Sequence, residues 1–329
     1  MATIIDVSRL ANVSRATVTR VLNEPGKVKE ATRIRVESAI KELNYVPSFS
    51  ARSLVSKNSG IIGLLLPDNK SGFFGSVMSA IHKKVNSSGK MLMVLEAQGL
   101  EEECRALKSL SEINCDGFIL YSRNLTVDTI IPYTKNKPVV VIDRKDIEGT
   151  SVYFDHFKAG FELAQIMIDA GHEHIAVVAG PKERKNSLER LNGCREAIEV
   201  AGLNLPDSMI AQGSYDNRFG MEATNIIMKN NPNTTAIVYC GERACAGGLK
   251  SLRMLGIQIP EQVSVASFDS YNLTEFLVPH VESIVYPVTE MAELAADKVI
   301  SQLSNSATEI QSEQVNFYFN HGDSIRDNH

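Results

Sequence analysis

Two arginines near the N-terminus, Arg15 and Arg20, have side chains that could read the bases of DNA. A guanidinium can donate two hydrogen bonds at once to guanine O6 and N7, which is worth about 1–3 kcal/mol of discrimination between bases. Ala16 can add only a methyl contact, such as one to a thymine methyl group. Nearby hydroxyl groups suit phosphate contacts, which position a protein without specifying a sequence: those of Ser14, Thr17 and Thr19. The same residues could form an ordinary exposed helix face, so the elements that carry them decide the interpretation.

Two short helices with a tight turn between them are predicted to position these side chains. Apolar residues repeat at the i, i+3, i+4 spacing of a helix face at Val7, Leu10 and Ala11, and again at Val18, Val21 and Leu22. Residues 12–14 form the turn between the two helices, and the last of them, Ser14, is well placed to cap the second helix. Burial of both apolar faces would leave the two arginines pointing outward. That arrangement is a helix-turn-helix, whose second helix enters the major groove of DNA.

The stretch from Thr3 to Asn23 resembles the N-terminus of the lactose/galactose-repressor (LacI/GalR) family. The residues in register with the family pattern are Val7, Ala11, Val13, Ser14, Thr17, Val18, Arg20, Val21, Leu22 and Asn23. Asn12 stands where the family commonly has glycine, and asparagine is the best alternative for a left-handed residue at a helix end. The resemblance implies that Arg15, Ala16 and Arg20 read bases. It also implies DNA contacts from the neighbouring polar residues Ser14, Thr17, Thr19 and Asn23.

A third helix is predicted from Glu30 to Leu43, with Asn44 ending it, and would complete a small three-helix core. The segment 47–58 then resembles the family's hinge, which forms a helix on DNA beside its twin from a second subunit. The resemblance implies that Ala51 and Leu54 contact DNA, with Leu54 wedged into the minor groove. Without the preceding motif, this segment would be interpreted as a plain linker.

The charge of the chain is unevenly distributed. The whole chain of 329 residues has a net charge of −5, but residues 1–57 carry +5 and the remainder −10. Because residues 1–57 (the head) are basic and the rest of the chain is acidic, we expect only the head to contact the phosphates of a nucleic acid. The length favours two or three domains. The N-terminus lacks an apolar secretory leader, which predicts a cytoplasmic protein without membrane contact, and the five cysteines form no CxxC pair, so reduced thiols are expected.

From residue 59 onward, apolar runs alternate with helical stretches, which predicts parallel sheets covered by helices on both faces. The predicted strands are Ile61–Leu66, Met91–Glu96, Gly117–Tyr121, Val139–Ile142, His174–Ala179, Ala236–Cys240, Val263–Phe268 and Ser283–Tyr286. The predicted helices are Ser76–Ser88, Glu102–Ile113, Phe157–Ala170, Leu188–Ala201, Gly220–Met228, Ala244–Leu255 and Val288–Leu303. Eight strands could form one sheet or two, and the similar runs at 61–67 and 174–181 favour two.

The resemblance implies an all-α helix-turn-helix domain (1–46), a hinge (47–58) and an α/β effector and dimerisation domain (59–329) with the periplasmic-binding-protein-like fold. This last domain would consist of two doubly wound subdomains. The first would take about 59–152 and 288–312, and the second about 153–287 and 313–329. The chain would cross between them near 151–157 and 285–290, and the segment Gln314–Phe319 would end in the second.

Candidate effector-binding residues follow predicted strands, because ligands in such folds bind at the carboxyl ends of strands. Phe73 and Phe74 could cover the C–H face of a sugar or a base, and Tyr215 is the other candidate ring in a chain without tryptophan. Core packing is an equal alternative for each phenylalanine. Asp143, at the end of the strand 139–142, could also face the cleft.

Three further candidates fall in runs that resemble family signatures. Arg190 lies in an Arg-Leu-x-Gly run, which implies that its guanidinium binds effector oxygens bidentately. Asp269 lies in a run typical of a carboxylate that accepts from two hydroxyls, with Ser267 in place of the usual glycine. A surface ion pair is the alternative for both. Glu242 stands where the family usually has Asp, and its extra methylene leaves the identity of the effector open.

No cofactor is expected. His172 and His174 lie two residues apart, but no third ligand is evident, so a metal site is not predicted. The sequence also offers no nucleophile–base set and no phosphate loop, which argues against an enzyme.

The helix-turn-helix residues and the resemblance to the LacI/GalR family together predict a sequence-specific transcriptional regulator. It would be a repressor that binds operator DNA as a homodimer or a tetramer. The resemblance to the galactose-repressor branch favours a sugar or glycoside effector over a purine. Effector binding in the cleft would change the affinity for DNA, at the nucleoid in the cytoplasm. The alternative is a cytoplasmic sugar-binding protein with no role in DNA regulation.

Overall fold

The computed structural model describes residues 2–45, 58–67, 72–147, 149–269, 272–305 and 311–328. The chain forms two compact units, Met1–Ile61 and Ile62–His329, and each is described by itself. The predicted hinge contacts of Ala51 and Leu54 lie outside the described residues. None of the helices in the described part of the chain has the length and apolar character that a transmembrane span requires.

The N-terminal unit contains three helices, α1 (Ile4–Leu10), α2 (Arg15–Asn23) and α3 (Glu30–Glu42), with a 3-10 turn at Pro25–Lys27. Thr3 and Asp6 form a capping box at the start of α1, and Ser14 caps α2 by accepting from the Thr17 N–H at 3.1 Å. Asn12 and Asn44 have φ angles of 49° and 45°, which confirms the left-handed ends predicted for these two residues. The core of this unit consists of Val7, Ala11, Val18, Val21, Val36, Ala39 and Tyr45.

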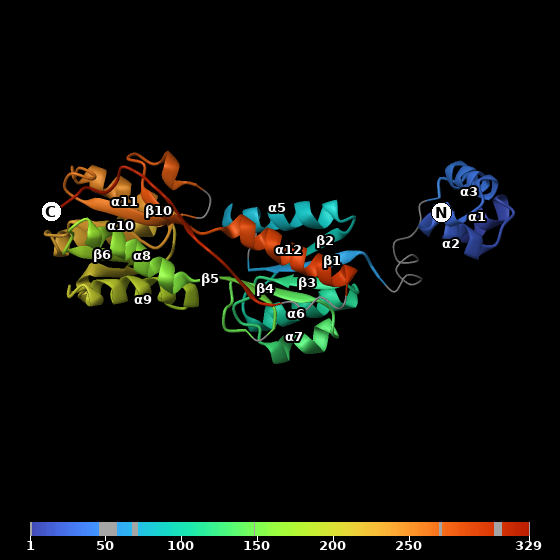
Figure 1. Ribbon diagram of the computed structural model, residues 1–329, viewed down its shortest axis with the longest axis horizontal. Coiled ribbons are helices and arrows are strands. Elements are labelled where there is room, and N and C mark those ends of the chain that lie inside the picture. The colour runs from blue at the N-terminus through green and yellow to red at the C-terminus, as the bar shows by residue number, and fades with distance from the viewer. Residues whose placement is uncertain are drawn as a thin grey trace. The chain divides into compact units, whose positions relative to one another are not determined.

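The larger unit contains two six-stranded sheets, which confirms the prediction of two α/β halves. The first sheet has the strand order β11-β5-β4-β3-β1-β2. Its strands are β1 (Ile61–Leu66), β2 (Met91–Glu96), β3 (Gly117–Leu120), β4 (Val139–Ile142), β5 (Ser151–Phe154) and β11 (Glu313–Val315). Figure 1 shows α5 (Gly72–Ser87) and α12 (Val288–Ser304) on one side of this sheet, and α6 (Leu100–Glu112) and α7 (Val127–Thr134) on the other. All six residues of β1 are buried, as expected for a strand covered on both faces. We call this half the first lobe.

The second sheet has the order β12-β10-β9-β8-β6-β7, with β12 antiparallel to β10. Its strands are β6 (Ile175–Ala179), β7 (Ile210–Gln212), β8 (Ala236–Tyr239), β9 (Ser264–Asp269), β10 (Glu282–Val285) and β12 (Tyr318–Asn320). Its helices form two packed pairs, α8 (His156–Asp169) with α9 (Lys185–Val200), and α10 (Asn217–Asn230) with α11 (Glu242–Met254). We call this half the second lobe.

The chain crosses between the lobes three times within the larger unit. The crossings after β5 and after β10 fall where the sequence predicted them, and α12 returns to the first lobe and packs against α5. The third crossing lies between β11 and β12. The predicted subdomain boundary between residues 312 and 313 is therefore wrong, because Glu313–Val315 pairs in parallel with β5 in the first sheet. Of these last two strands, only β12 belongs to the second sheet. The physical reason is edge protection, since β11 covers the otherwise unpaired edge of β5.

The elements missed by the sequence prediction are short or irregular. Helix α7 has eight residues with Pro132 inside it, which disturbs a helical pattern. Strand β7 has only three residues, all half-buried, so its apolar signal is weak. Long buried strands were found within one or two residues of their ends, because continuous apolar runs mark them clearly.

His172, one of the two histidines considered for metal binding, serves a structural role. It is 1% exposed, and its two ring nitrogens lie 3.0 Å from Thr235 Oγ1 and 2.9 Å from Ser264 Oγ. These bonds join the loop before β6 to the starts of β8 and β9. Burial, with the nearby charge of Arg326, lowers the pKa of His172.

This lowered pKa predicts acid sensitivity. The unfolded chain binds a proton at His172 near its ordinary pKa of about 6.5, whereas the folded chain binds it only at lower pH, so the free energy of unfolding should fall as the pH drops from 7 to 5. We expect His172→Gln to flatten this pH dependence in urea unfolding curves, whereas His82→Gln, at an exposed position, should retain the wild-type slope. Equal slopes for His172→Gln and wild type would contradict the assignment.

Candidate functional site

The first candidate site is the outer face of α2. Val18 is fully buried and Val21 is 5% exposed, so the opposite side of the helix faces solvent. Arg15, Ala16 and Arg20 are all exposed there, as the sequence predicted. The cap places the start of α2 firmly, so the two guanidinium groups project from a rigid element.

The hydroxyl residues of this face are partly engaged with one another. Ser14 Oγ and Thr17 Oγ1 lie 2.9 Å apart, and Thr17 and Thr19 are half-buried. Asn23 is the last residue of α2. The hydroxyl groups of Ser14 and Thr17 and the backbone N–H groups beside them lie near the start of α2, where phosphate contacts commonly form.

The second candidate site is a cleft between the two lobes. One part of it is a cavity of about 330 Å³. Another part, of about 480 Å³, shares with it the lining residues Tyr121, Arg123, Pro181, Arg184 and Asn186. The lining follows the carboxyl ends of β1, β3, β6, β8 and β10. In each sheet the order reverses at the first strand, between β1 and β3 and between β6 and β8, and ligands of doubly wound sheets bind at such points.

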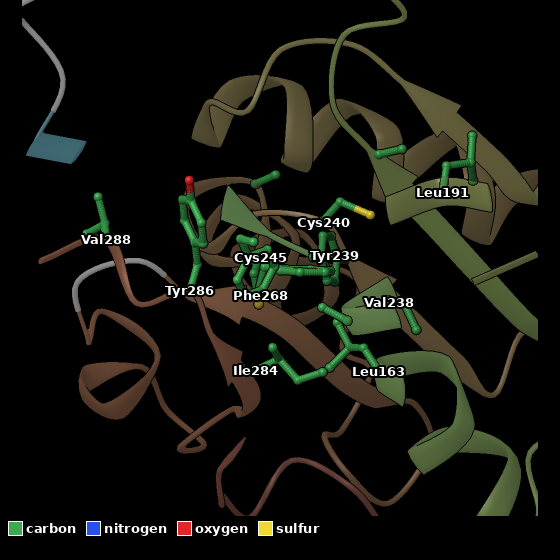
Figure 2. Packing of buried hydrophobic residues seen from close by; sticks show 14 of the residues in the cluster. Leu163, Leu191, Val238, Tyr239, Cys240, Cys245, Phe268, Ile284, Tyr286 and Val288 are labelled. Carbon is green, nitrogen blue, oxygen red and sulfur yellow. The ribbon is translucent and has the colours of Figure 1, made fainter. Parts of the chain in front are cut away.

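An aromatic wall closes one side of the cleft. The rings of Phe73 and Tyr286 are stacked, with centroids 5.4 Å apart and planes 8° apart. Tyr121 meets Phe73 edge-on at 5.9 Å and Phe74 at 5.0 Å. Phe74 is only 5% exposed and belongs to the core. Figure 2 shows the Tyr286 hydroxyl pointing away from the packed side chains around Phe268. Tyr121 and Tyr286 are also buried, at 4% and 2% exposed, so the half-buried Phe73 offers the accessible apolar face, which suits the C–H face of a ring-shaped ligand.

A chain of hydrogen bonds links the lobes beside this wall. Arg190 Nε donates to His156 Nδ1 at 3.1 Å, so the other ring nitrogen of His156 carries the proton and donates to Asp143 Oδ1 at 2.9 Å. Tyr121 donates to Asp143 Oδ2 at 2.8 Å. Burial alone would raise the pKa of Asp143, but the interaction with His156 and the hydrogen bond from Tyr121 hold this pKa below its ordinary value. A carboxylate in the first lobe thus orients a histidine and an arginine of the second.

The structure brings most predicted effector residues together. Phe73, Phe74, Arg190, Tyr215 and Glu242 line the 330 Å³ cavity, and Asp143 lines its neighbour. Arg190 already donates from a terminal nitrogen to the Cys240 carbonyl at 2.7 Å, and its guanidinium lies 4.1 Å from the Phe268 ring centre. Its bidentate contact with an effector therefore stays a prediction.

The sequence also predicts effector binding by Asp269. It is fully buried and lines neither cavity. Its carboxylate accepts hydrogen bonds from the Leu273 N–H at 3.2 Å and from the N–H and hydroxyl of Thr274. These bonds tie the Asp269 carboxylate to Leu273 and Thr274, and its contact with an effector stays a prediction.

Two buried polar atoms of the cavity lining lack a hydrogen-bond partner among the described residues, the Tyr215 hydroxyl and the Asn186 side-chain oxygen. The Ser187 hydroxyl beside Tyr215 is also buried and makes no bond of good geometry. Unpaired buried polar groups are costly, so such atoms at a cavity wall indicate a ligand that pairs with them. The described residues contain no group of three or more potential metal ligands.

Comparison with known families agrees with this geometry. Residues 3–48 match the family described as bacterial regulatory proteins of the lacI family, and residues 59–321 match the periplasmic binding proteins and sugar binding domain of the LacI family. The chain belongs to the LacI family. As a LacI-family member it is a DNA-binding transcriptional regulator, with a periplasmic-binding-protein-like domain for a small-molecule effector.

Relatives of this LacI-family chain match it almost from end to end. The HTH-type transcriptional regulator AscG of Escherichia coli K12 is 31% identical over 310 residues, 92% of each chain. The ribose operon repressor of the same strain is 32% identical over 321 residues, 96% of this chain and 97% of its own. The solved Lac repressor dimer bound to operator and the anti-inducer ONPF has a TM-score of 0.88 at 21% identity, covering 99% of both chains, a likeness of fold alone.

Several cleft residues of this LacI-family chain were missed from the sequence. Tyr121 and Tyr286 each follow a strand end directly, so the same rule that selected Asp143 would have found them. His156, Arg123 and Arg184 had no such signal, because loops and a helix start bring them to the cleft.

Proposed function

We propose that this LacI-family regulator is a repressor that binds operator DNA as a dimer, and that a carbohydrate in the cleft changes its affinity for DNA. The observation that carries the proposal is the combination, in one chain, of an exposed Arg15/Arg20 face on a capped helix-turn-helix with a cleft at the switch points of two sheets. A sugar-binding protein without a DNA role would have no use for the first feature. Dimerisation follows because a single head offers a small interface, and two-fold pairing doubles it.

A carbohydrate effector is supported by the lining of the cleft. The half-buried Phe73 ring, stacked on the buried Tyr286, can cover a sugar's C–H face, and Glu242 can accept from hydroxyls. The name of the ribose operon repressor, among the relatives, also supports a sugar. Tyr215 and Asn186 would gain hydrogen-bond partners when such a ligand binds.

We propose that ligand binding in the cleft changes DNA binding by changing the arrangement of the two lobes. A ligand that contacts both lobes stabilises their closed arrangement relative to the open one. The hinge, proposed at 47–58 between a head at 1–46 and the effector domain, would transmit that change to DNA binding. We also propose that the chain is not an enzyme, since His156 and Asp143 are engaged in orienting Arg190. A DNA-binding regulator acts where the chromosome lies, which places it in the cytoplasm.

The test compares the full chain with a variant lacking residues 1–57. Sequences selected from random DNA should be near-palindromic and bound by the full chain only, whereas sugars that raise the melting temperature should do so for both proteins. Specific DNA binding by the shortened variant would refute the role of the head. A full chain that selects no sequence would refute the regulator as proposed.

A further inference from the structure

Three contacts hold the Arg190 guanidinium at the wall of the 330 Å³ cavity, and one of them can be lost by protonation. A terminal nitrogen donates to the Cys240 carbonyl at 2.7 Å, and the Phe268 ring centre lies 4.1 Å from the guanidinium carbon. Neither of these partners titrates. The third contact runs from Arg190 Nε to His156 Nδ1 at 3.1 Å, and an imidazole nitrogen that gains a proton is no longer an acceptor.

The His156 ring is enclosed and its orientation is fixed. It is 2% exposed at the start of α8, and the ring centres of Phe154 and Tyr286 lie 4.8 Å and 5.4 Å away. Its Nε2 lies 2.9 Å from Asp143 Oδ1. Because the Nε–H of Arg190 can only donate, Nδ1 must accept and Nε2 must carry the proton. The ring is therefore neutral in this arrangement.

Asp143 sets this tautomer from the first lobe, whereas His156 and Arg190 belong to the second. Its N–H donates to the Val152 carbonyl at 2.8 Å, and its second carboxylate oxygen accepts from Tyr121 at 2.8 Å. Burial alone would raise the pKa of Asp143, but the interaction with His156 holds it below its ordinary value, so the group stays a carboxylate in mild acid. The acceptor that Arg190 uses thus depends on a residue of the other lobe.

The charged and titratable groups around His156 decide what a proton would do there. They are Asp143 at the end of β4, Tyr121 after β3, Tyr286 after β10, Asp155 beside His156, and Lys185, Glu189 and Arg190 on α9. A protonated ring would keep Asp143 as an ion-pair partner, but both of its nitrogens would be donors. Arg190 Nε would then meet a donor of like charge and lose this bond.

We infer that His156 is a positioning residue of the effector site: it fixes the Arg190 guanidinium through the tautomer that Asp143 sets, and it releases this arginine when the ring gains a proton. The inference rests on the proposed function, since Arg190 is the arginine predicted to bind effector oxygens. Effector affinity should therefore fall in mild acid. Movement of Asp143 away from His156, as the lobes rearrange, should free the ring and loosen Arg190 in the same way.

The first test needs no effector. In the full chain with isotope-labelled arginine, the Nε–H signal of Arg190 is assigned by its absence in Arg190→Lys. At neutral pH this hydrogen should be protected from exchange with water, because it is buried and bonded. Between about pH 7.5 and 5.5, its protection relative to free arginine at the same pH should fall about tenfold or more, as expected for loss of a charged hydrogen bond.

Two variants separate positioning from packing. The amide of His156→Asn places an oxygen where Nδ1 stands and does not titrate, so Arg190 should stay protected at both pH values. The amide of His156→Gln reaches the position of Nε2 instead, so the bond to Asp143 is kept and the acceptor for Arg190 is lost. Protection should then be low already at neutral pH. Circular dichroism confirms that both variants are folded.

The second test measures effector binding by calorimetry, with whichever of ribose, glucose and cellobiose raises the melting temperature of the full chain at neutral pH. The affinity for that sugar should be about tenfold lower in His156→Gln and close to wild type in His156→Asn. Mild acid should weaken binding to the wild type but not to His156→Asn. If none of the sugars binds, the carbohydrate part of the proposed function fails, while the exchange measurements still decide the inference.

Two controls address the other titrating groups. Burial raises the pKa of Glu189, so this carboxyl also gains a proton as the pH falls, but Glu189→Gln should keep the acid response of Arg190. His82→Asn, at an exposed position on α5 that lines neither part of the cleft, should match the wild type throughout. The inference is overturned if acid leaves Arg190 protected in the wild type, if Glu189→Gln abolishes the acid response, or if the two His156 variants protect Arg190 equally.

Discussion

Replacing Arg20 with alanine is expected to abolish selective operator binding while weak, salt-dependent binding to any DNA persists. Arg20 is exposed on α2, on the side opposite the buried Val18 and Val21. Losing a bidentate contact to guanine costs about 1–3 kcal/mol for each head, and a dimer loses it twice. The affinity for the operator should therefore fall by roughly two to four orders of magnitude, whereas the phosphate contacts that support non-specific binding remain. Fluorescence anisotropy with operator and scrambled duplexes, across a salt series, measures both.

Arg35→Ala provides the control for this prediction. Arg35 is also exposed and also carries one positive charge, but it lies on α3 and not on the reading helix. Its loss should weaken binding to operator and scrambled DNA by a similar factor. If Arg20→Ala also weakened binding to operator and to scrambled DNA by a similar factor, the claim that Arg20 reads bases would be wrong. Arg20 would then contribute only its charge to DNA binding.

Replacing Gly193 with alanine is expected to have the largest effect on stability. Helices α8 and α9 touch through two glycines: a Cβ on Gly193 would lie 2.0 Å from the Phe157 carbonyl oxygen, and one on Gly160 would lie 2.2 Å from the Arg190 oxygen. Both obstacles are backbone atoms, so the helices themselves must separate. Overpacking of this kind costs about 1–3 kcal/mol and sometimes more. Urea unfolding should show the loss as a lower midpoint.

Separation of α8 and α9 should also weaken the cleft, because His156 begins one helix and Arg190 lies on the other. Gly75→Ala is the matched control, since Gly75 lies in the first turn of α5 and a Cβ there meets nothing within 4 Å. Alanine is the better helix former by about 1 kcal/mol, so this variant should be unchanged or slightly more stable. Wild-type stability for Gly193→Ala would show that the two helices can adjust without cost.

The hydrogen-bonded chain from Arg190 through His156 to Asp143 explains how the lobes can remain aligned without a ligand. It runs from α9 across the first crossing to the end of β4, and each distance is 3.1 Å or less. The part of the cleft that borders this chain is lined by residues of both lobes, including Arg123 of the first and Arg184 of the second. An effector would therefore add its own bridge between the lobes to one that the protein already has.

Local sequence signals suffice to predict the main helices and strands and the outward face of α2. Periodicity of apolar residues, a serine cap and two left-handed asparagines are local signals, and each acts within a few residues of its own position. The positions of Arg15 and Arg20 follow from them, and so do the buried strands. The ends of the predicted strands also indicate which residues lie near the cleft, because the residues that follow parallel strands lie together at the carboxyl edge of the sheet.

Which side chains share the cleft depends on contacts that arise in the folded chain. Phe73 and Tyr286 are more than two hundred positions apart in the chain and stack because α5, which carries Phe73, packs against α12, which begins just after Tyr286. Asp269 ends β9, yet it is fully buried, and its carboxylate accepts hydrogen bonds from the N–H groups of Leu273 and Thr274. Glu313–Val315 pairs with the edge of the first sheet, and a boundary drawn from the sequence could not anticipate that pairing. These outcomes depend on contacts between distant segments, which local propensity and strand-end rules do not encode.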